Sequence, residues 1–179
     1  MPKVYIGIGS NIDKHIHIPR VVRELAEKFG DIEVSPIYET LAEGFSGENF
    51  FNLVVAIETN ISPQEMRQFL RELEAQHGRV RESKNQFISR TLDLDQLLYG
   101  QLQINKDGVH VPSSDITNYA FVLKPLADIA GDMPHPILRS TFAQLWQQFD
   151  KASLNLMPVQ IADDISEPRV SSSTPKIAP

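Results

Sequence analysis

Strand and helix patterns alternate along the chain in the order strand, helix, strand, strand, helix, strand. Strand-like runs are rich in β-branched and aromatic residues, whereas the helical stretches repeat apolar residues every three or four positions. The predicted strands cover residues 3–9, 33–40, 50–59, 91–99 and 102–104, and the predicted helices include residues 21–29, 62–73, 119–129 and 141–149. This order predicts a ferredoxin-like α+β sandwich.

The second helix has a well-marked start. Ser62 is a suitable N-cap, Pro63 suits the first turn, and Glu65 completes a capping-box pattern. Gly78 supplies a stop signal after the last apolar residue of the stripe. We therefore expect a helix that begins at Ser62 and ends close to Gly78.

Composition excludes several classes of protein. The chain has 179 residues, no cysteine and a formal net charge of −6. An acidic balance argues against a broad nucleic-acid surface, which is usually basic. The absence of cysteine excludes a disulfide framework and a thiolate nucleophile. No run of about 18 apolar residues occurs and no signal-peptide pattern is present, so we expect a cytoplasmic protein that binds neither nucleic acid nor membrane.

The C-terminal segment differs from the rest of the chain. Residues 158–179 hold four prolines and a Ser-Ser-Ser-Thr run at 171–174. Such a segment buries too little apolar surface to offset the entropy of ordering it. We therefore predict one domain over residues 1–157 and a flexible tail over 158–179, with a docked strand near 159–161 as the alternative.

Two aspartates share one predicted strand. Because side chains alternate faces along a strand, Leu92, Leu94 and Leu98 should point one way, with Asp93 and Asp95 pointing the other way. Their Cα atoms would lie roughly 6.5–7 Å apart, twice the rise per residue. Paired carboxylates repel unless a cation lies between them, and Mg²⁺ accepts such ligands together with substrate phosphates. The alternative is a strand with a wet polar face.

Basic residues surround the entrance to this strand. Arg90 precedes the aspartates, and Arg79, Arg81 and Lys84 lie in the preceding loop. Guanidinium groups beside carboxylates suit a metal-bound polyphosphate. For Arg81 or Lys84 alone, a solvent-facing position on a loop is the alternative.

Four blocks between residues 5 and 129 resemble the 6-hydroxymethyl-7,8-dihydropterin pyrophosphokinase family. They are IGSN at 8–11, NFFN at 49–52, EAQHGRVR at 74–81 and RTLDLD at 90–95. The resemblance implies an α/β/α sandwich with a mainly antiparallel sheet. It also implies transfer of a diphosphoryl group from ATP to the hydroxymethyl group of a reduced pterin, with release of AMP.

The resemblance also implies roles for individual residues. Asp93 and Asp95 match the ligands of two Mg²⁺ ions. Arg79, Arg81 and Arg90 match the family's catalytic arginines around the triphosphate, and Glu74 matches a family glutamate near ATP, with a plain surface glutamate as the alternative. Gln96 and Ser113 stand at family positions beside the nucleotide. His110 could partly substitute for the family histidine at the Ser113 position, with a wet surface histidine as the alternative. The partners implied are ATP and a reduced pterin, and we expect a monomer.

A pterin-binding set is implied in the same way. Thr40, Phe50, Asn52 and Phe121 match family residues around the pterin. A pterin is a flat heterocycle that suits aromatic faces, with an amide to pair its polar edge. The alternative for the two phenylalanines is an ordinary place in the core.

The chain also departs from the family pattern. Leu41-Ala42 replaces prolines, Ile88-Ser89 replaces a Gly-Pro pair, and Gln96 replaces an aliphatic residue. Ser113 stands where the family typically has histidine, and Tyr119 where many members have arginine. Within this resemblance, the departures imply a divergent member in which the residues expected around ATP are altered.

Three functional hypotheses follow. The first is an active pterin diphosphokinase, which the paired aspartates favour. The second is a non-catalytic or weakly active paralogue that binds pterin or nucleotide, which Ser113 and Tyr119 favour. The third is a nucleotidyl- or glycosyltransferase with a D-x-D metal site, which no glycine-rich loop supports.

Overall fold

The computed structural model describes residues 1–41, 48–79, 91–150 and 156–159. A central sheet has the strand order β5-β1-β4-β3-β8, with β2 paired to β4, and its paired strands are antiparallel. Its strands are β1 (Lys3–Ser10), β2 (Glu33–Val34), β3 (Ile37–Thr40), β4 (Phe50–Glu58), β5 (Asp93–Tyr99) and β8 (Leu156–Val159).

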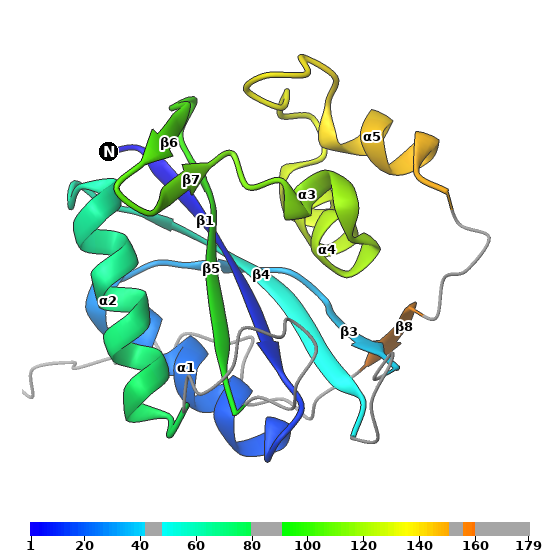
Figure 1. Ribbon diagram of the computed structural model, residues 1–179. Helices are drawn as coiled ribbons and strands as arrows, with labels where there is room; N and C mark the ends of the chain where they lie inside the picture. Colours follow the sequence, from blue (N-terminus) through cyan, green and yellow to red (C-terminus); the bar gives the residue numbers. More distant parts are fainter. Residues whose placement is uncertain (42–47, 80–90, 151–155, 160–179) are drawn as a thin grey trace, which may run out of the picture.

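Helices cover both faces of this sheet (Figure 1). One face carries α1 (Lys14–Phe29) and α2 (Pro63–Gln76), and the other carries α3 (Asp115–Asn118), α4 (Ala120–Ala130) and α5 (Phe142–Gln148). Each face has its own buried apolar cluster, the first around Ile18, Leu25 and Leu70, the second around Leu123, Leu126 and Phe142. The predicted α/β/α sandwich with an antiparallel sheet is therefore confirmed.

The capping box of α2 forms as its sequence predicts. The Ser62 hydroxyl accepts a hydrogen bond from the Glu65 amide at 3.2 Å, and the Glu65 carboxylate accepts one from the Ser62 amide at 2.7 Å. Such a cap stabilises a helix by about 1 kcal/mol. The cap fixes the residue at which α2 begins. It thereby also sets the direction in which Glu74, near the other end of the helix, points.

The predicted strand over residues 33–40 is interrupted. Pro36 has no amide hydrogen to donate to a neighbouring strand. The Ser35 hydroxyl instead accepts a hydrogen bond from the Val54 amide at 2.9 Å. The segment therefore forms two short strands, β2 and β3, separated by Ser35 and Pro36.

A hairpin occupies the region where one short strand was predicted at residues 102–104. It consists of β6 (Ile104–Lys106) and β7 (Val109–Val111). Asp107 and Gly108 connect them with φ angles of 54° and 73°, which suits a two-residue hairpin turn of type I′. The Asp-Gly pair is the sequence signal for this hairpin, and it places β7 against β5 and α2.

The predicted facing of β5 is correct at its start and wrong at its end. Leu92 and Leu94 belong to the core under α1 and α2, as expected, but Leu98 belongs to the other core. The pairing between β1 and β5 shifts by one residue after Gln96, so the strand is bulged there. A bulge reverses the facing of every later residue.

Strand β8 closes the edge of the sheet beside β3, with Ile37 paired to Val159 and Thr40 to Leu156. The boundary predicted between residues 157 and 158 thus falls inside a strand, close to the alternative that placed a strand at 159–161. The remainder of the predicted tail, residues 160–179, lies outside the described residues. Within the described part of the chain, no helix is long and apolar enough to span a membrane.

Candidate active site

Gly9 forms the floor of the candidate site. It pairs with Asn52 of β4 on one side and with Asp93 of β5 on the other. A Cβ atom added at Gly9 would lie 3.4 Å from the Asn52 side-chain oxygen and 3.8 Å from the Asp93 Cβ. The amide expected to bind pterin and a carboxylate expected to bind metal therefore lie on one face, separated by a residue without a side chain.

The end of α2 and the residues that follow it bring Glu74 and Arg79 to the start of β5. Glu74 is only 1% exposed, and its carboxylate accepts a hydrogen bond from the Leu94 amide at 2.9 Å. Arg79 forms ion pairs with both Glu74 and Asp93. A surface position for Glu74 is therefore excluded, because this carboxylate bridges β5 and the arginine.

A histidine pair anchors the same end of α2 to α1. His77 is buried, and its Nε2 atom lies 2.8 Å from the Glu24 carboxylate. Its Nδ1 atom lies 2.8 Å from Nδ1 of His17. Desolvation and the neighbouring His77 lower the pKa of His17. The contacts hold in place the helix end that carries Glu74 and Arg79.

Asp95 lies at the centre of the negative charge. Desolvation, followed by repulsion from Asp93, Glu74 and Asp115, raises its pKa to about 7. Its side chain remains exposed to the adjoining cavity, so a ligand can reach it. Desolvation and the charge of Asp93 also raise the pKa of Asp115. A cation bound here would relieve this repulsion.

The donor set suits magnesium. Among the residues that the structure describes, no three or more metal-ligand side chains converge on one point. Mg²⁺ commonly takes one or two protein carboxylates and completes its shell with water and substrate phosphates. Asp93 and Asp95, two residues apart on β5, fit that pattern.

A cavity of about 430 Å³ adjoins Asp95. It lies between α2, β5, β7 and the start of α3. Its lining residues include Arg67, Leu70, Arg71, Asp95, Gln96, Val109, His110, Ser113 and Asp115. The predicted ATP-contacting residues Gln96, His110 and Ser113 are thus brought together at one hollow.

Two lining arginines were not predicted. Arg67 and Arg71 lie seven and three residues before Glu74, so helical periodicity places all three on one face of α2. The available signal was this periodicity relative to Glu74, which the resemblance to the family placed near ATP. Asp115 was also missed, and no motif around it indicated a site.

The polar residues of the cavity differ in whether their side chains have hydrogen-bond partners within the protein. Both polar atoms of the Gln96 amide are buried and have no hydrogen-bond partner among the described residues. The Ser113 hydroxyl accepts a hydrogen bond from the Asp115 amide at 3.2 Å, and His110 Nδ1 lies 2.5 Å from the Asn105 side-chain oxygen. Gln96 therefore offers both a donor and an acceptor to a ligand in this cavity.

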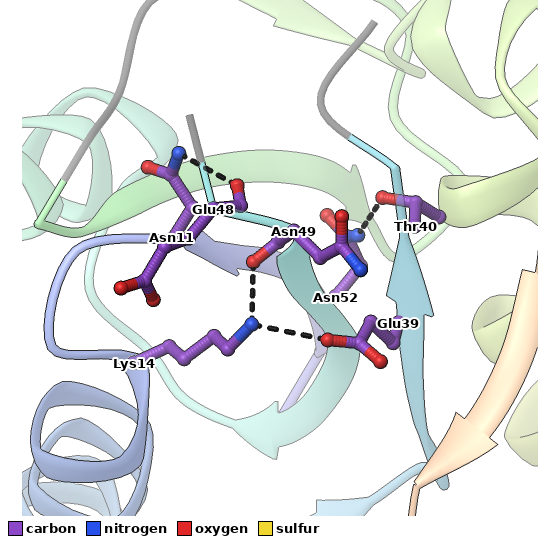
Figure 2. A network of polar contacts seen from close by, with 7 residues as sticks. All are labelled: Asn11, Lys14, Glu39, Thr40, Glu48, Asn49 and Asn52. Carbon is purple, nitrogen blue, oxygen red and sulfur yellow. Dashed lines mark hydrogen bonds and ion pairs between the residues drawn. The ribbon is translucent and has the colours of Figure 1, made fainter. Parts of the chain in front are cut away.

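Of the four expected pterin residues, Asn52 is the one that lies directly beside Gly9. Asn52 donates a hydrogen bond to the Thr40 hydroxyl at 2.9 Å, as Figure 2 shows. Phe50 pairs with Thr40 across β3 and β4. Phe121, at the start of α4, stacks on Tyr119 with ring centroids 5.1 Å apart. Of the predicted arginines, Arg81 and Arg90 lie outside the described residues.

A family model described as 7,8-dihydro-6-hydroxymethylpterin-pyrophosphokinase (HPPK) matches residues 5–131. The chain belongs to this family. The matched span includes every residue predicted above to bind metal, ATP or pterin, whereas α5 and β8 lie beyond the segment that matches the HPPK family.

Curated relatives support the assignment to the HPPK family. A pyrophosphokinase of Aquifex aeolicus is 34% identical over 142 residues, which cover 78% of this chain and 87% of that protein. A pyrophosphokinase of Methylorubrum extorquens is 36% identical over 137 residues, covering 74% and 85%. The folic acid synthesis protein fol1 of Pneumocystis carinii is 30% identical, and the match covers 81% of this chain but only 20% of that protein.

Solved HPPK structures share the fold. The Plasmodium falciparum HPPK-DHPS wild type, crystallised with SDX-DHP, aligns with a TM-score of 0.60 and 14% identity. The alignment covers 83% of this chain and 43% of that chain. An HPPK-DHPS in complex with substrates aligns with a TM-score of 0.63 and 15% identity over 82% of this chain. The chain spans less than half the length of these two-part HPPK proteins.

Proposed function

We propose that this protein transfers the β,γ-diphosphoryl group of ATP to the hydroxymethyl group of 6-hydroxymethyl-7,8-dihydropterin, releasing AMP. The observation that best supports this proposal is the position of Gly9 between Asn52 and Asp93. It brings an amide suited to a pterin edge next to carboxylates suited to metal-bound phosphates. Family membership makes the reaction the expected use of this arrangement.

The pterin is proposed to lie over the face of Thr40 and Asn52. The Asn52 side chain offers both a donor and an acceptor, and it can exchange its internal bond with Thr40 for bonds to the heterocycle. Phe50 and Phe121 are proposed to supply aromatic contacts. Holding the hydroxymethyl oxygen in a fixed position beside the phosphate favours the reaction, because orientation replaces random encounter.

The nucleotide is proposed to occupy the cavity lined by Gln96, His110 and Ser113. Arg67 and Arg71 bring positive charge to the same hollow from α2. Arg79 lies beside the aspartates, where its planar fork can contact phosphate oxygens. Glu74 positions Arg79, and Arg81 and Arg90 are proposed to complete the basic surroundings of the triphosphate.

Asp93 and Asp95 are proposed to hold Mg²⁺, two ions in all. When bound, the metal neutralises phosphate charge and aligns the β-phosphorus for in-line attack. In the reaction the pterin hydroxymethyl oxygen forms a bond to the β-phosphorus and gives up its proton to solvent, while the bond from that phosphorus to the oxygen bridging to the α-phosphorus breaks and this oxygen leaves on AMP. The side chains around the phosphates stabilise the charge that develops as AMP departs.

A second candidate is a weakly active or non-catalytic pterin- or nucleotide-binding paralogue. The observation that favours it is the stacking of Tyr119 on Phe121, at a position where many relatives have an arginine. Tyrosine cannot offset the charge that develops on the leaving phosphate. Ser113, in turn, offers only a neutral hydrogen bond.

The deciding experiment is incubation with ATP, Mg²⁺ and 6-hydroxymethyl-7,8-dihydropterin, with nucleotide products separated. We expect AMP to form only when the pterin is present, in equal amount to pterin diphosphate. ADP would instead indicate transfer of a single phosphoryl group. Saturable binding of both ligands without turnover would establish the binding paralogue.

A further inference from the structure

Lys14 is a buried lysine outside the residues assigned so far. It is the first residue of α1 and is 7% exposed. Its ammonium donates to the Asn49 carbonyl at 2.7 Å and to the Glu39 carboxylate at 3.1 Å, and it lies 4.5 Å from the centre of the Phe51 ring. Lysine is rarely buried unless such partners replace its water. These contacts account for the burial of Lys14.

The contacts of Lys14 join the end of β3 to the residue that precedes β4 (Figure 2). Glu39 belongs to β3, and Asn49 immediately precedes β4. Asn11 adds a neighbouring restraint, because its side-chain amide donates to the Glu48 carbonyl at 3.1 Å. Two successive carbonyl groups ahead of β4 are therefore held by side chains, one from Asn11 in the connection after β1 and one from Lys14 at the start of α1.

The restrained backbone carries the proposed pterin residues on its opposite face. Thr40 follows Glu39 and Phe50 follows Asn49, and Thr40 pairs directly with Phe50. Neighbouring residues in a strand point to opposite faces. Lys14 thus contacts the ends of β3 and β4 from one face of the sheet, and the side chains of Thr40 and Phe50 lie on the opposite face.

We propose that Lys14 is a positioning residue for the pterin site. This inference rests on the proposed function, because it concerns the same pterin. Lys14 makes no contact with the ligand in this proposal. It fixes the spacing between the ends of β3 and β4, so that Thr40, Phe50 and Asn52 are preorganised before the pterin binds.

The test compares Lys14→Met, Lys14→Arg and the control Lys3→Met. Lys14→Met keeps the apolar stem against Phe51 but removes the charge and all donors, whereas Lys14→Arg keeps both. Lys3 is a matched control, since it also pairs with a glutamate, Glu33 at 2.7 Å, and lies 5.7 Å from a ring centre, that of Tyr5. It lies at the opposite end of β1 from Gly9.

The measurements are kcat, the Michaelis constants for the pterin substrate and for ATP, and the Kd for α,β-methylene-ATP. Lys14→Met should raise the Michaelis constant for the pterin about tenfold, as expected for loss of charge-assisted bonds that order a site. Both nucleotide constants and kcat should stay within about twofold, because the nucleotide cavity lies on other elements. Lys14→Arg should restore most of the pterin affinity, and Lys3→Met should change none of these constants.

Equal losses of pterin and nucleotide affinity, or an unchanged Michaelis constant for the pterin in folded Lys14→Met, would overturn the positioning role. Should Lys14→Met fail to fold, Glu39→Gln removes the counter-ion while leaving the lysine, and it should weaken pterin binding in the same selective way. If the wild-type protein itself neither binds nor converts the pterin, the proposed function fails. An active wild-type enzyme with unaffected variants removes only the role of Lys14.

Discussion

Arg79 forms an ion pair with Asp93, so the guanidinium occupies a carboxylate that is proposed to hold Mg²⁺. Metal binding to the free protein must therefore compete with this arginine. The same arginine would be released toward the phosphates when metal-bound ATP enters. The first prediction tests this exchange.

Arg79→Ala should bind Mg²⁺ more tightly than the wild-type protein in the absence of nucleotide, by about threefold to tenfold, because a nearby positive charge is removed. The same variant should bind ATP less tightly and turn over more slowly. Titration calorimetry with Mg²⁺ and then with α,β-methylene-ATP measures both effects. Lys3→Ala, which breaks an exposed pair with Glu33 at the end of β1 far from Gly9, serves as the control and should change neither affinity.

Asp95→Asn should reduce turnover by at least about a hundredfold, because a neutral amide is a poorer magnesium ligand and leaves phosphate charge uncompensated. The fold should persist, since the substitution removes a charge that three other carboxylates repel. Turnover by product separation and the far-ultraviolet circular dichroism spectrum check the two parts. Asp132→Asn, at an exposed loop position, is the control. A rate within about threefold of wild type would contradict the metal role.

The pH dependence of stability follows from the raised pKa of Asp95. In the folded, metal-free protein this pKa is about 7, above the ordinary value of 3.8. The folded state thus retains a proton between these values that the unfolded state has lost. The stability contributed by protonated Asp95 is complete below about pH 4 and disappears as pH rises through 7.

We therefore expect Asp95→Asn to exceed the wild type in melting temperature at pH 8, with the difference shrinking toward pH 4. Added Mg²⁺ should raise the melting temperature of the wild type more than that of the variant, because bound cation relieves the same repulsion. Thermal melts at several pH values, with and without Mg²⁺, measure this. A difference that is constant across pH would mean that Asp95 is not the titrating group.

Gln96→Leu should raise stability and weaken ATP binding together. The buried amide of Gln96 has no partner among the described residues, and an unsatisfied amide costs about 1–3 kcal/mol, so its removal should raise the melting temperature by roughly 2–4 °C for each kcal/mol recovered. Loss of the amide should raise the Michaelis constant for ATP if this group binds the nucleotide. Gln103→Leu is the matched control, because the Gln103 amide already donates to the Pro136 carbonyl at 3.1 Å. That variant should gain no stability.

Shortening the chain tests the role of β8. A protein that ends at Leu156 loses Met157, Pro158 and Val159, which pair with β3. It should melt several degrees below the full chain, because β3 becomes the sheet edge and Ile37 loses its partner Val159. A protein that ends at Val159 should keep the pairing and melt with the full chain. Equal melting of both shortened proteins would show that β8 contributes nothing.

Much of the fold was predictable because local signals agreed with the final structure. Ser62 and Glu65 form the expected cap, and the alternating apolar residues of β4 are buried in the sheet. The errors arose where tertiary pairing decides. The bulge after Gln96 reflects how β5 meets β1, which a local pattern does not encode, whereas a strand close to β8 was the alternative that the sequence offered for residues 159–161.

The residues of the candidate site could be predicted where they belong to the sequence blocks that resemble the family. Asp93, Asp95, Glu74 and Arg79 belong to specific blocks, and the structure brings them together. Arg67 and Arg71 lie on a helix outside those blocks, so only their phase relative to Glu74 pointed to the cavity. Lys14 was not predicted because its partners are a backbone carbonyl and a strand residue distant in sequence.

Because Gly9 pairs with both Asn52 and Asp93, β1 sets the distance between the backbones that carry these two residues. Adjacent strands lie about 4.8 Å apart, so the backbones of β4 and β5 are about 10 Å apart across β1. Backbone hydrogen bonds set that interval, and side-chain substitution cannot lengthen it. Under the proposed function, the residues around the two co-substrates can therefore diverge in sequence without changing the distance between the strand that carries Asn52 and the strand that carries Asp93.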